Sequence, residues 1–240
     1  MADFNSDTAV VGIIGAMDVE VDSLRDAMTE RDDTEIAQIL FSRGAIAGVS
    51  CVVAKCAVGK VNAALCAQIL IDRFDVTHVI NTGAAGAIDA SLNIFDFVVS
   101  TDCVEHDMEV SNFGYELGQV PGLSVGTFKA DKVLQNAAIA AIEQSGNDAC
   151  AMLGRIASGD QFVRDDAVKR HIAQEFDAAC CEMEGAAIAH ACWLNGVPFV
   201  VIRAISDKAD GSQAIDYLDF ETRAAKMCAH VTEQLLAELA

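Results

Sequence analysis

The stretch GIIGAMDVEVDSLRD, residues 12–26, joins a buried strand, a glycine turn and an amphipathic helix. The apolar run 9–14 predicts the strand, and apolar residues recur at helical spacing from Met17 to Met28. Units of this kind begin nucleotide-binding α/β folds, yet the fingerprint G-x-G-x-x-G is absent. Asp18, Glu20 and Asp22 occupy the first helical turn, where a phosphate would otherwise bind. We therefore expect this turn to hold something other than a phosphate.

The charge and cysteine content narrow the class of protein. The 240 residues carry 16 Lys and Arg against 36 Asp and Glu, a net charge of -20, which argues against a nucleic acid or an anionic membrane as partner. We find no signal peptide and no apolar run of about 18 residues. The nine cysteines lack C-x-x-C spacing, so we expect reduced core thiols, a cytoplasmic location, and neither a metal nor a cofactor.

No linker, repeat or low-complexity tract divides the chain. We expect one domain over residues 1–240, with residues 1–8 flexible. Strands are predicted at 9–14, 36–42, 46–57, 77–81, 95–102, 151–158, 178–181 and 197–204, and helices at 18–29, 59–74, 131–144, 165–174, 183–195 and 220–239. This alternation predicts an α/β three-layer sandwich, with a mixed, largely parallel central sheet between helices.

Glycines and carboxylates gather where predicted strands end: at residues 17–20, in NTGAAGA (81–87), in CEMEG (181–185) and in AISD (204–207). Ligands of open α/β sheets bind outside the carboxyl ends of the strands, so these clusters are expected to share one rim. Acids without lysines favour a polyhydroxylated, neutral or cationic ligand over a phosphorylated one.

Two of these clusters have both a structural and a functional interpretation. Glu20 flanks the apolar stripe of its helix, so partial burial would raise its pKa and suit it to act as a base; Asp18 and Asp22 are expected only to favour the helix dipole. Gly83 and Gly86 in NTGAAGA either form a tight turn or leave a bare backbone that a sugar or base approaches closely.

The other two clusters place acids at the ends of apolar strands. On extended backbone, Glu182 and Glu184 would lie on one side with Met183 opposite, and ribose hydroxyls could satisfy the two carboxylates. Arg203 either pairs with a carboxylate or serves the ligand. Ser206 and Asp207 either cap the next segment or form a general acid, with Asp207 held protonated by its apolar strand.

Seven segments in order over residues 10–233 resemble the 5′-methylthioadenosine/S-adenosylhomocysteine nucleosidase family of the nucleoside phosphorylase superfamily. These segments are GIIGAMDVEV (12–21), VGKVNAA (58–64), NTGAAGA (81–87), HDMEVSNFGYELGQVPG (106–122), SGDQFV (158–163), CEMEGAAIAH (181–190) and VPFVVIRAISDKAD (197–210). The resemblance implies a nucleoside phosphorylase-like fold, hydrolysis of an adenine N-glycosidic bond, a role in methionine salvage, and a homodimer.

The resemblance also implies a role for each matching residue. Glu20 would activate water and Asp207, aided by Ser206, would protonate adenine at N7. Ala84, Gly86, Glu182 and Arg203 would lie near the water and sugar, and Met183 and Glu184 would contact the ribose. Phe162 and Val163 would contact adenine. The 5′-substituent would be contacted by Met17, Val58 and Tyr217, and by Phe113 and Pro121 of the neighbouring subunit.

The sequence departs from the family pattern at two of these positions. Ala84 replaces a frequent serine that helps to hold the water, and Tyr217 replaces a frequent phenylalanine at the 5′ pocket. Two alternative functions stay open: a phosphate-dependent nucleoside phosphorylase and a non-catalytic nucleoside-binding protein. Phosphorylases typically carry an arginine where this chain has Asn81, and a binding protein would be expected to lose one of the three acids.

Overall fold

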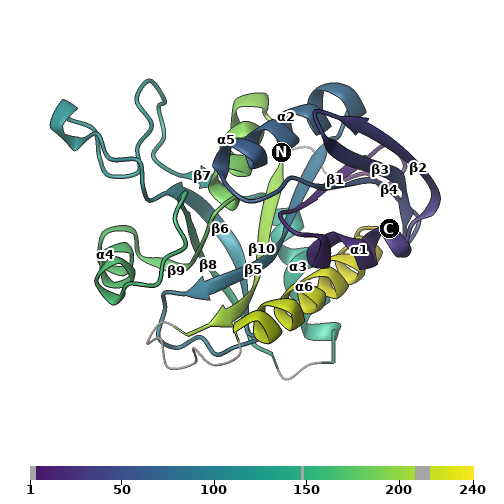
Figure 1. Ribbon diagram of the computed structural model, residues 1–240. Coiled ribbons are helices and arrows are strands. Elements are labelled where there is room, and N and C mark those ends of the chain that lie inside the picture. Colours follow the sequence, from purple (N-terminus) through teal and green to yellow (C-terminus); the bar gives the residue numbers. More distant parts are fainter. Residues whose placement is uncertain (1–3, 147–148, 209–216) are drawn as a thin grey trace.

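The computed structural model describes residues 4–146, 149–208 and 217–240, with side chains in the last range from residue 222 onward (Figure 1). Its strands are β1 (Val11–Gly15), β2 (Thr29–Ile36), β3 (Ile39–Ile46), β4 (Val49–Lys55), β5 (His78–Ala87), β6 (Phe97–Glu105), β7 (Phe128–Lys129), β8 (Ala151–Ser158), β9 (Ala178–Glu182) and β10 (Phe199–Asp207). Its helices are α1 (Asp18–Asp26), α2 (Lys60–Phe74), the short 3₁₀ helix η1 (Ser111–Phe113), α3 (Lys132–Gln144), α4 (Asp166–Phe176), α5 (Gly185–Asn195) and α6 (Tyr217–Leu239).

The strands form one sheet that closes on itself over part of its width. Strand β10 pairs with β5 on one side and β6 on the other, so β10, β6, β8, β9 and β5 make a ring. Strands β1, β4, β3 and β2 continue outward from β5. The predicted three-layer sandwich is therefore wrong in this respect, because β5 is long enough to pair with β1 over residues 78–81 and with β9 at Gly86 and Ala87.

The sheet is also less parallel than predicted. Among the described residues, half of the strand pairings are parallel; the others, including β5–β9 and β10–β6, are antiparallel. The directions matter for the site, because β1, β5 and β10 run parallel and end on the same side, whereas β9 approaches β5 from the opposite direction.

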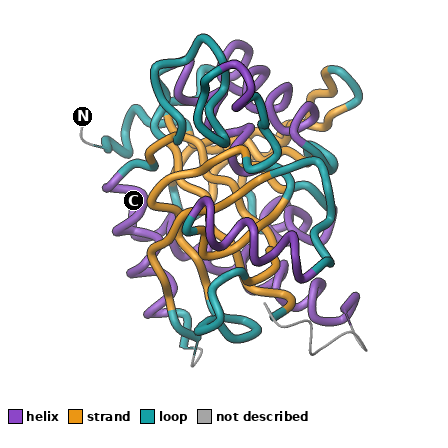
Figure 2. The backbone as a smooth tube through the Cα atoms, turned by 90° about the vertical axis from the view of Figure 1, so that its left-hand side faces the viewer, coloured by secondary structure: helices purple, strands orange, loops and turns teal. Residues whose placement is uncertain are grey.

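Helices cover both faces of the sheet, as predicted, and Figure 2 shows the strands enclosed between them. Helix α6 packs against α1, α3 and strands β5 and β10 on one side, while α2 and α5 pack together on the other. One buried cluster lies between the sheet and α2 and α5, including Leu70 and Ile188. A second cluster joins the sheet to α1, α3 and α6 through Leu24, Leu134 and Leu235.

The six predicted helices are all present, with ends that differ by a few residues. Helix α1 ends at Asp26 rather than at residue 29, and α5 begins at Gly185 rather than at residue 183. Strand β8 has the predicted bounds. Two strands differ in a way that matters. Strand β5 continues through Ala87 instead of ending at Asn81. Of the charged strand β2, only the last residue, Ile36, was predicted to lie in a strand.

All nine cysteines are free, and all but Cys150 are buried, as expected of core thiols. In the ranges that the structure describes, no helix is long and apolar enough to cross a membrane. The single domain and the flexible segment 1–8 stay predictions; within that segment the ring of Phe4 lies 4.9 Å from the ring of His78.

Candidate active site

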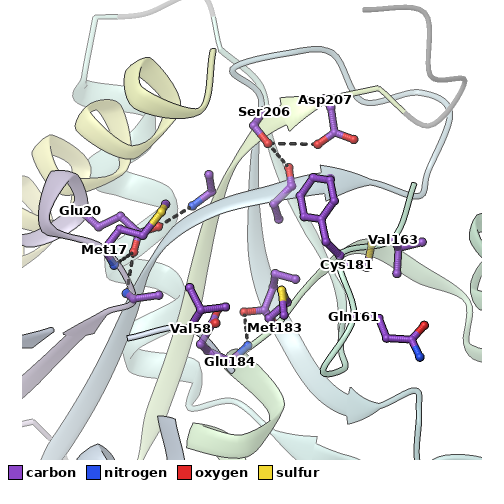
Figure 3. A pocket seen from close by; sticks show the side chains of 16 residues that line it. Met17, Glu20, Val58, Gln161, Val163, Cys181, Met183, Glu184, Ser206 and Asp207 are labelled. Atoms are coloured by element: carbon purple, nitrogen blue, oxygen red, sulfur yellow. Dashed lines mark hydrogen bonds between the residues drawn. The ribbon is translucent and has the colours of Figure 1, made fainter. Parts of the chain in front are cut away.

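One cavity collects the residues that the four strand-end clusters supply. It is lined by Ala16, Met17, Glu20, Val58, Ala84, Ala85, Gly86, Gln161, Phe162, Val163, Cys181, Glu182, Met183, Glu184, Ser206 and Asp207 (Figure 3). Strands β1, β5 and β10 deliver their residues at carboxyl ends that point the same way, as predicted. Residues 181–184 come from β9, which runs against β5, so the closure of the ring rather than a common strand direction brings them there.

Among the predicted site residues whose side chains the structure describes, all but three line this cavity. Arg203 lies beneath it, fully enclosed. Phe113 and Pro121 belong to the segment between β6 and β7, and Phe113 is 76% exposed. Tyr217 begins α6, but its side chain lies outside the described residues. Sequence reasoning missed four lining residues that adjoin the predicted ones: Ala16, Ala85, Gln161 and Cys181.

Glu20 is the third residue of α1, and its carboxylate folds back over the start of the helix. Oε2 accepts hydrogen bonds from the backbone N–H groups of Ala16 at 2.6 Å and Met17 at 3.0 Å, and Oε1 accepts one from Ala84 at 3.3 Å. Burial raises the pKa of Glu20, and the charge of Arg203 together with these donors counters only part of that rise. The expected buried, basic carboxylate is thus present.

The glycines of NTGAAGA make room for carboxylates. A Cβ on Gly83 would lie 2.6 Å from Oε1 of Glu20, and a Cβ on Gly86 would lie 3.1 Å from both carboxylate oxygens of Asp207. The segment is the end of β5 rather than the tight turn considered above. Its bare backbone admits the two acids at the edge of the cavity.

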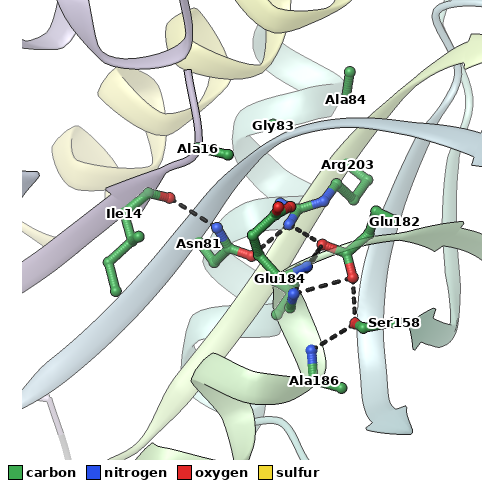
Figure 4. A network of polar contacts seen from close by, with 12 residues as sticks. Ile14, Ala16, Asn81, Gly83, Ala84, Ser158, Glu182, Glu184, Ala186 and Arg203 are labelled. Carbon is green, nitrogen blue, oxygen red and sulfur yellow. Dashed lines mark hydrogen bonds and ion pairs between the residues drawn. The ribbon is translucent and has the colours of Figure 1, made fainter. Parts of the chain in front are cut away.

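Beneath the cavity, Glu182 and Arg203 form a buried ion pair (Figure 4). Glu182 also accepts hydrogen bonds from Ser158 Oγ and from the backbone N–H of Gly185 at 2.8 and 3.0 Å. Arg203 donates to Asn81 Oδ1 at 2.5 Å, and the Asn81 amide donates to the Ile14 carbonyl at 2.8 Å. Protein donors therefore satisfy the Glu182 carboxylate, where we had expected ribose hydroxyls to do so.

Glu184 has a freer carboxylate than Glu182. It is the N-cap residue of α5, outside β9, so the predicted strand alternation fails and Met183 lines the same cavity as both acids. Its Oε1 accepts one hydrogen bond, from the backbone N–H of Gly59 at 2.8 Å. Burial, and then the charge of Glu182, raise the pKa of Glu184 to about 7.

The Gly59 turn that binds Glu184 is anchored from the opposite side. Gly59 has φ of +100°, a conformation that favours glycine. The next residue, Lys60, donates through Nζ to Asp107 at 2.6 Å and to Glu105 at 3.0 Å, and through its backbone N–H to Asp160 at 2.8 Å. These contacts hold the start of α2 in place beside the cavity.

At the other end of the cavity, a β-bulge places Ser206 and Asp207. The register between β10 and β5 shifts between Ile205 and Asp207, so Ser206 and Asp207 both line the cavity. Ser206 Oγ donates to Asp207 Oδ1 at 3.1 Å. The prediction that apolar surroundings enclose Asp207 is wrong: its side chain is 23% exposed, and Oδ2 lies 3.2 Å from the ammonium of Lys169.

Comparison with known proteins identifies the family to which this chain belongs. The model of the phosphorylase superfamily matches residues 10–237. A 5′-methylthioadenosine/S-adenosylhomocysteine nucleosidase of Geobacillus sp. (strain WCH70) is 42% identical over 230 residues, which cover 95% of this chain and 98% of the relative. The chain belongs to this nucleosidase family.

Solved structures agree with the membership in the nucleosidase family. The nucleosidase of Colwellia psychrerythraea 34H, solved in complex with adenine, has a TM-score of 0.92 and 39% identity, and the match covers 98% of this chain and 97% of that one. The futalosine hydrolase of Helicobacter pylori strain 26695 has a TM-score of 0.89 and 30% identity, with 98% of this chain and 100% of that chain covered. The nucleoside phosphorylase-like fold is thereby confirmed.

Of the two departures from the nucleosidase pattern, the cavity shows what the one at Ala84 affects. The methyl group of Ala84 lines the cavity where a serine hydroxyl is frequent, but the Ala84 backbone N–H still contacts Glu20. Phe162 and Val163, expected at adenine, both line the cavity, and the Arg164 guanidinium lies 4.9 Å from the centre of the Phe162 ring.

Proposed function

We propose that this chain hydrolyses the N-glycosidic bond of 5′-methylthioadenosine and S-adenosylhomocysteine, and also of 5′-deoxyadenosine, releasing adenine and the 5′-substituted ribose. The observation that carries this proposal is the placement of three acids, Glu20, Glu184 and Asp207, around one cavity. Glu20 and Glu184 lie near the positive charge of Arg203. Asp207 lies at the opposite end of the cavity, 3.2 Å from the ammonium of Lys169. Acids at both ends suit a reaction in which a sugar becomes cationic and a purine leaves.

Glu20 is assigned as the base. It accepts a proton from the water that attacks C1′ of the ribose, while the C1′–N9 bond breaks and its electron pair passes to adenine. The raised pKa of Glu20 suits a base that works near neutrality. The nearby carboxylates stabilise the positive charge that develops on the ribose.

Asp207 is assigned as the acid. It donates a proton to N7 of adenine as the bond breaks, so the purine departs neutral rather than as an anion. Ser206, which donates to Oδ1 of Asp207, orients the carboxyl group. The proton lost by water thus resides on Glu20, and the proton gained by adenine comes from Asp207.

The remaining cavity residues are assigned to binding. Glu184, whose carboxylate accepts only one protein hydrogen bond among the described residues, accepts bonds from the ribose hydroxyls, with Met183 beside the sugar. Phe162 stacks on adenine and the Val163 backbone contacts its edge. Met17, Val58 and Tyr217 are assigned to the 5′-substituent. Glu182 and Arg203 support Glu20 and Glu184 from below instead of touching the ligand.

A phosphorylase on this scaffold is less well supported. Asn81 is buried and bonded to Arg203 and Ile14, and Ala84 offers no hydroxyl to a phosphate. The carboxylate of Glu20 occupies the helix N-terminus where an anion would bind. A non-catalytic binding protein has no need of all three acids.

The assembly and the setting belong to the same proposal. We propose a cytoplasmic homodimer in which Phe113 and Pro121 of the segment 106–127 complete the 5′ pocket of the neighbouring subunit. The exposure of Phe113 and the extension of this segment away from the body of the subunit (Figure 1, teal, upper left) support the assignment.

The deciding experiment is an adenine-release assay with four nucleosides, each with and without phosphate: methylthioadenosine, adenosylhomocysteine, 5′-deoxyadenosine and aminodeoxyfutalosine. We expect release from the first three at rates that phosphate leaves unchanged. A requirement for phosphate would identify a phosphorylase, and binding without release would identify a nucleoside-binding protein.

A further inference from the structure

The charged side chain of Lys169 is buried at a position of α4 where the helical pattern predicts an apolar residue. It lies on α4 on the same face as Ile172 and Phe176, and all three are buried. The Asp165 side chain caps this helix by accepting from the backbone N–H groups of Ala167 and Val168, which fixes the register of the next turn. A lysine on a buried stripe is costly unless a partner meets its charge.

The partner is Asp207. The Lys169 Nζ atom lies 3.2 Å from Oδ2 of Asp207 and also donates to the backbone carbonyl of Lys208 at 3.1 Å. The Lys169 side chain is only 7% exposed, and Lys169 does not line the cavity, whereas Asp207 does. The ammonium therefore reaches the carboxylate from behind, and Ser206 Oγ holds its other oxygen.

We propose that Lys169 is a positioning residue that fixes the Asp207 carboxyl group where it meets the departing purine. This inference rests on the proposed function, which makes Asp207 the proton donor to N7. The Lys169 ammonium contacts Oδ2 of Asp207 and Ser206 Oγ donates to Oδ1, so both carboxyl oxygens are held from the protein side. A small displacement of a reacting group lowers the rate strongly, so a contact that fixes this carboxyl group contributes to turnover.

Among the described groups around Asp207, Lys169 is the cation that contacts its carboxyl group. From β9, Cys181 faces Asp207 as a neutral thiol, because burial, and then the nearby Asp207, raise its pKa to about 12. From β10, the Lys208 ammonium is directed to Asn93 Oδ1 at 3.2 Å, and Ser206 is uncharged. From β5, Gly86 presents only backbone.

The test compares three substitutions. Lys169→Gln keeps a hydrogen-bond donor and removes the charge, Lys169→Met removes both, and Lys169→Arg keeps the charge. Lys132→Met is the control, since Lys132 lies at the start of α3, exposed, and donates to Gln135. The measurements are kcat with methylthioadenosine, kcat with a 4-nitrophenyl 5-methylthioriboside whose phenolate leaves without a proton, and the melting temperature.

For Lys169→Gln and Lys169→Met we expect a loss that depends on the leaving group, because only the purine needs a proton from a correctly placed Asp207 carboxyl group. Near pH 7, turnover of methylthioadenosine should fall by about 10-fold, while the nitrophenyl riboside is hydrolysed as before. Lys169→Arg should restore turnover of methylthioadenosine.

An unchanged rate with methylthioadenosine, or an equal loss with both leaving groups, in a folded Lys169→Gln protein would overturn the inference and leave Lys169 a structural residue. If Lys169→Met fails to fold, the Gln and Arg variants decide. Wild-type protein that releases no adenine from any nucleoside would refute the proposed function instead, and the two failures are thereby distinguishable.

Discussion

Oε1 of Glu20 occupies the space that a side chain on Gly83 would need: a Cβ there would lie 2.6 Å from the oxygen and 3.1 Å from the Glu20 carboxyl carbon. We therefore expect Gly83→Ala to push the base out of place. Turnover of methylthioadenosine should fall by at least about 100-fold, since small displacements at a reacting group cost that much. Gly126→Ala is the control, because its added methyl group meets only Gln119 Cβ at 3.9 Å. Full activity in Gly83→Ala would show that the position of Glu20 does not matter.

Replacing the carboxylate of Glu20 by an amide tests its role as a base. Glu20→Gln keeps the volume but cannot take a proton from water, so kcat should fall by about 10²–10⁴ while the substrate still binds. Calorimetry with substrate and steady-state kinetics give the two quantities. Asp22→Asn, which replaces an exposed acid two residues further along the same helix, should leave kcat unchanged. A Glu20→Gln protein with near-normal kcat would remove Glu20 from the mechanism.

The pKa of Glu184 predicts how stability depends on pH. In the folded protein this pKa is raised from 4.5 to about 7, so between these values the native state holds a proton that the unfolded chain has released. The free energy of unfolding should therefore decrease as pH rises from 4.5 through 7, by ~3 kcal/mol for this group. Urea denaturation at pH 5 to 8 measures it.

Glu184→Gln provides the comparison, because it removes this titration and keeps the shape. Its free energy of unfolding should fall less between pH 5 and 8 than that of the wild type, since the raised pKa of Glu20 is common to both proteins. Glu143→Gln, at an exposed position on α3, controls for the loss of a charge. Equal slopes for wild type and Glu184→Gln would mean that Glu184 titrates as in the unfolded chain.

The dimer proposal predicts an effect of Phe113 on substrate affinity. Because its side chain is 76% exposed, Phe113→Ala should leave the unfolding of its own subunit unchanged. If the ring completes the 5′ pocket of a neighbour, its loss should raise KM for methylthioadenosine by about 10-fold or more, as expected for a buried phenylalanine. Leu153→Ala, at a half-exposed position on β8, is the control. A fully active monomer in sedimentation would contradict the proposal.

Much of this site could be predicted from the sequence, because its acids directly follow apolar runs that mark the ends of strands. The predicted position of Glu20 on its helix and the termini of β8 agree with the structure, as does the burial of most cysteines. The predictions that failed concern features that depend on pairing with another strand or on contacts with distant residues. Strand β2 reads TERDDTEI and is exposed except at its last residue, so no alternation marks it, and only pairing with β3 makes it a strand.

The same reason explains why the surroundings of Asp207 were predicted wrongly. The apolar run before it suggested enclosure, but the side chain emerges at the cavity edge and meets Lys169, which lies 38 residues earlier in the sequence. The signal for Lys169 was present as a lysine in register with Ile172 and Phe176, but in a helix such a residue is normally taken to be solvated. A ring closed by β10 and β6 likewise leaves no local trace in either strand.

The role of Asp207 itself is best tested by the leaving group. Asp207→Asn keeps the shape and a hydrogen-bond donor but has no proton to transfer. With methylthioadenosine, whose purine must be protonated to leave easily, kcat should fall by about 10²–10⁴. Along a series of nucleosides whose bases leave with progressively less help, ending with 4-nitrophenyl 5-methylthioriboside, the ratio of wild-type to Asp207→Asn rates should fall toward one. Asp102→Asn, which breaks the 2.6 Å ion pair with Arg155 on the neighbouring strand, removes a paired aspartate outside the cavity and should give a flat ratio across the series. A flat ratio for Asp207→Asn as well would mean that Asp207 only holds the purine ring, and the proton would then have to reach N7 from water.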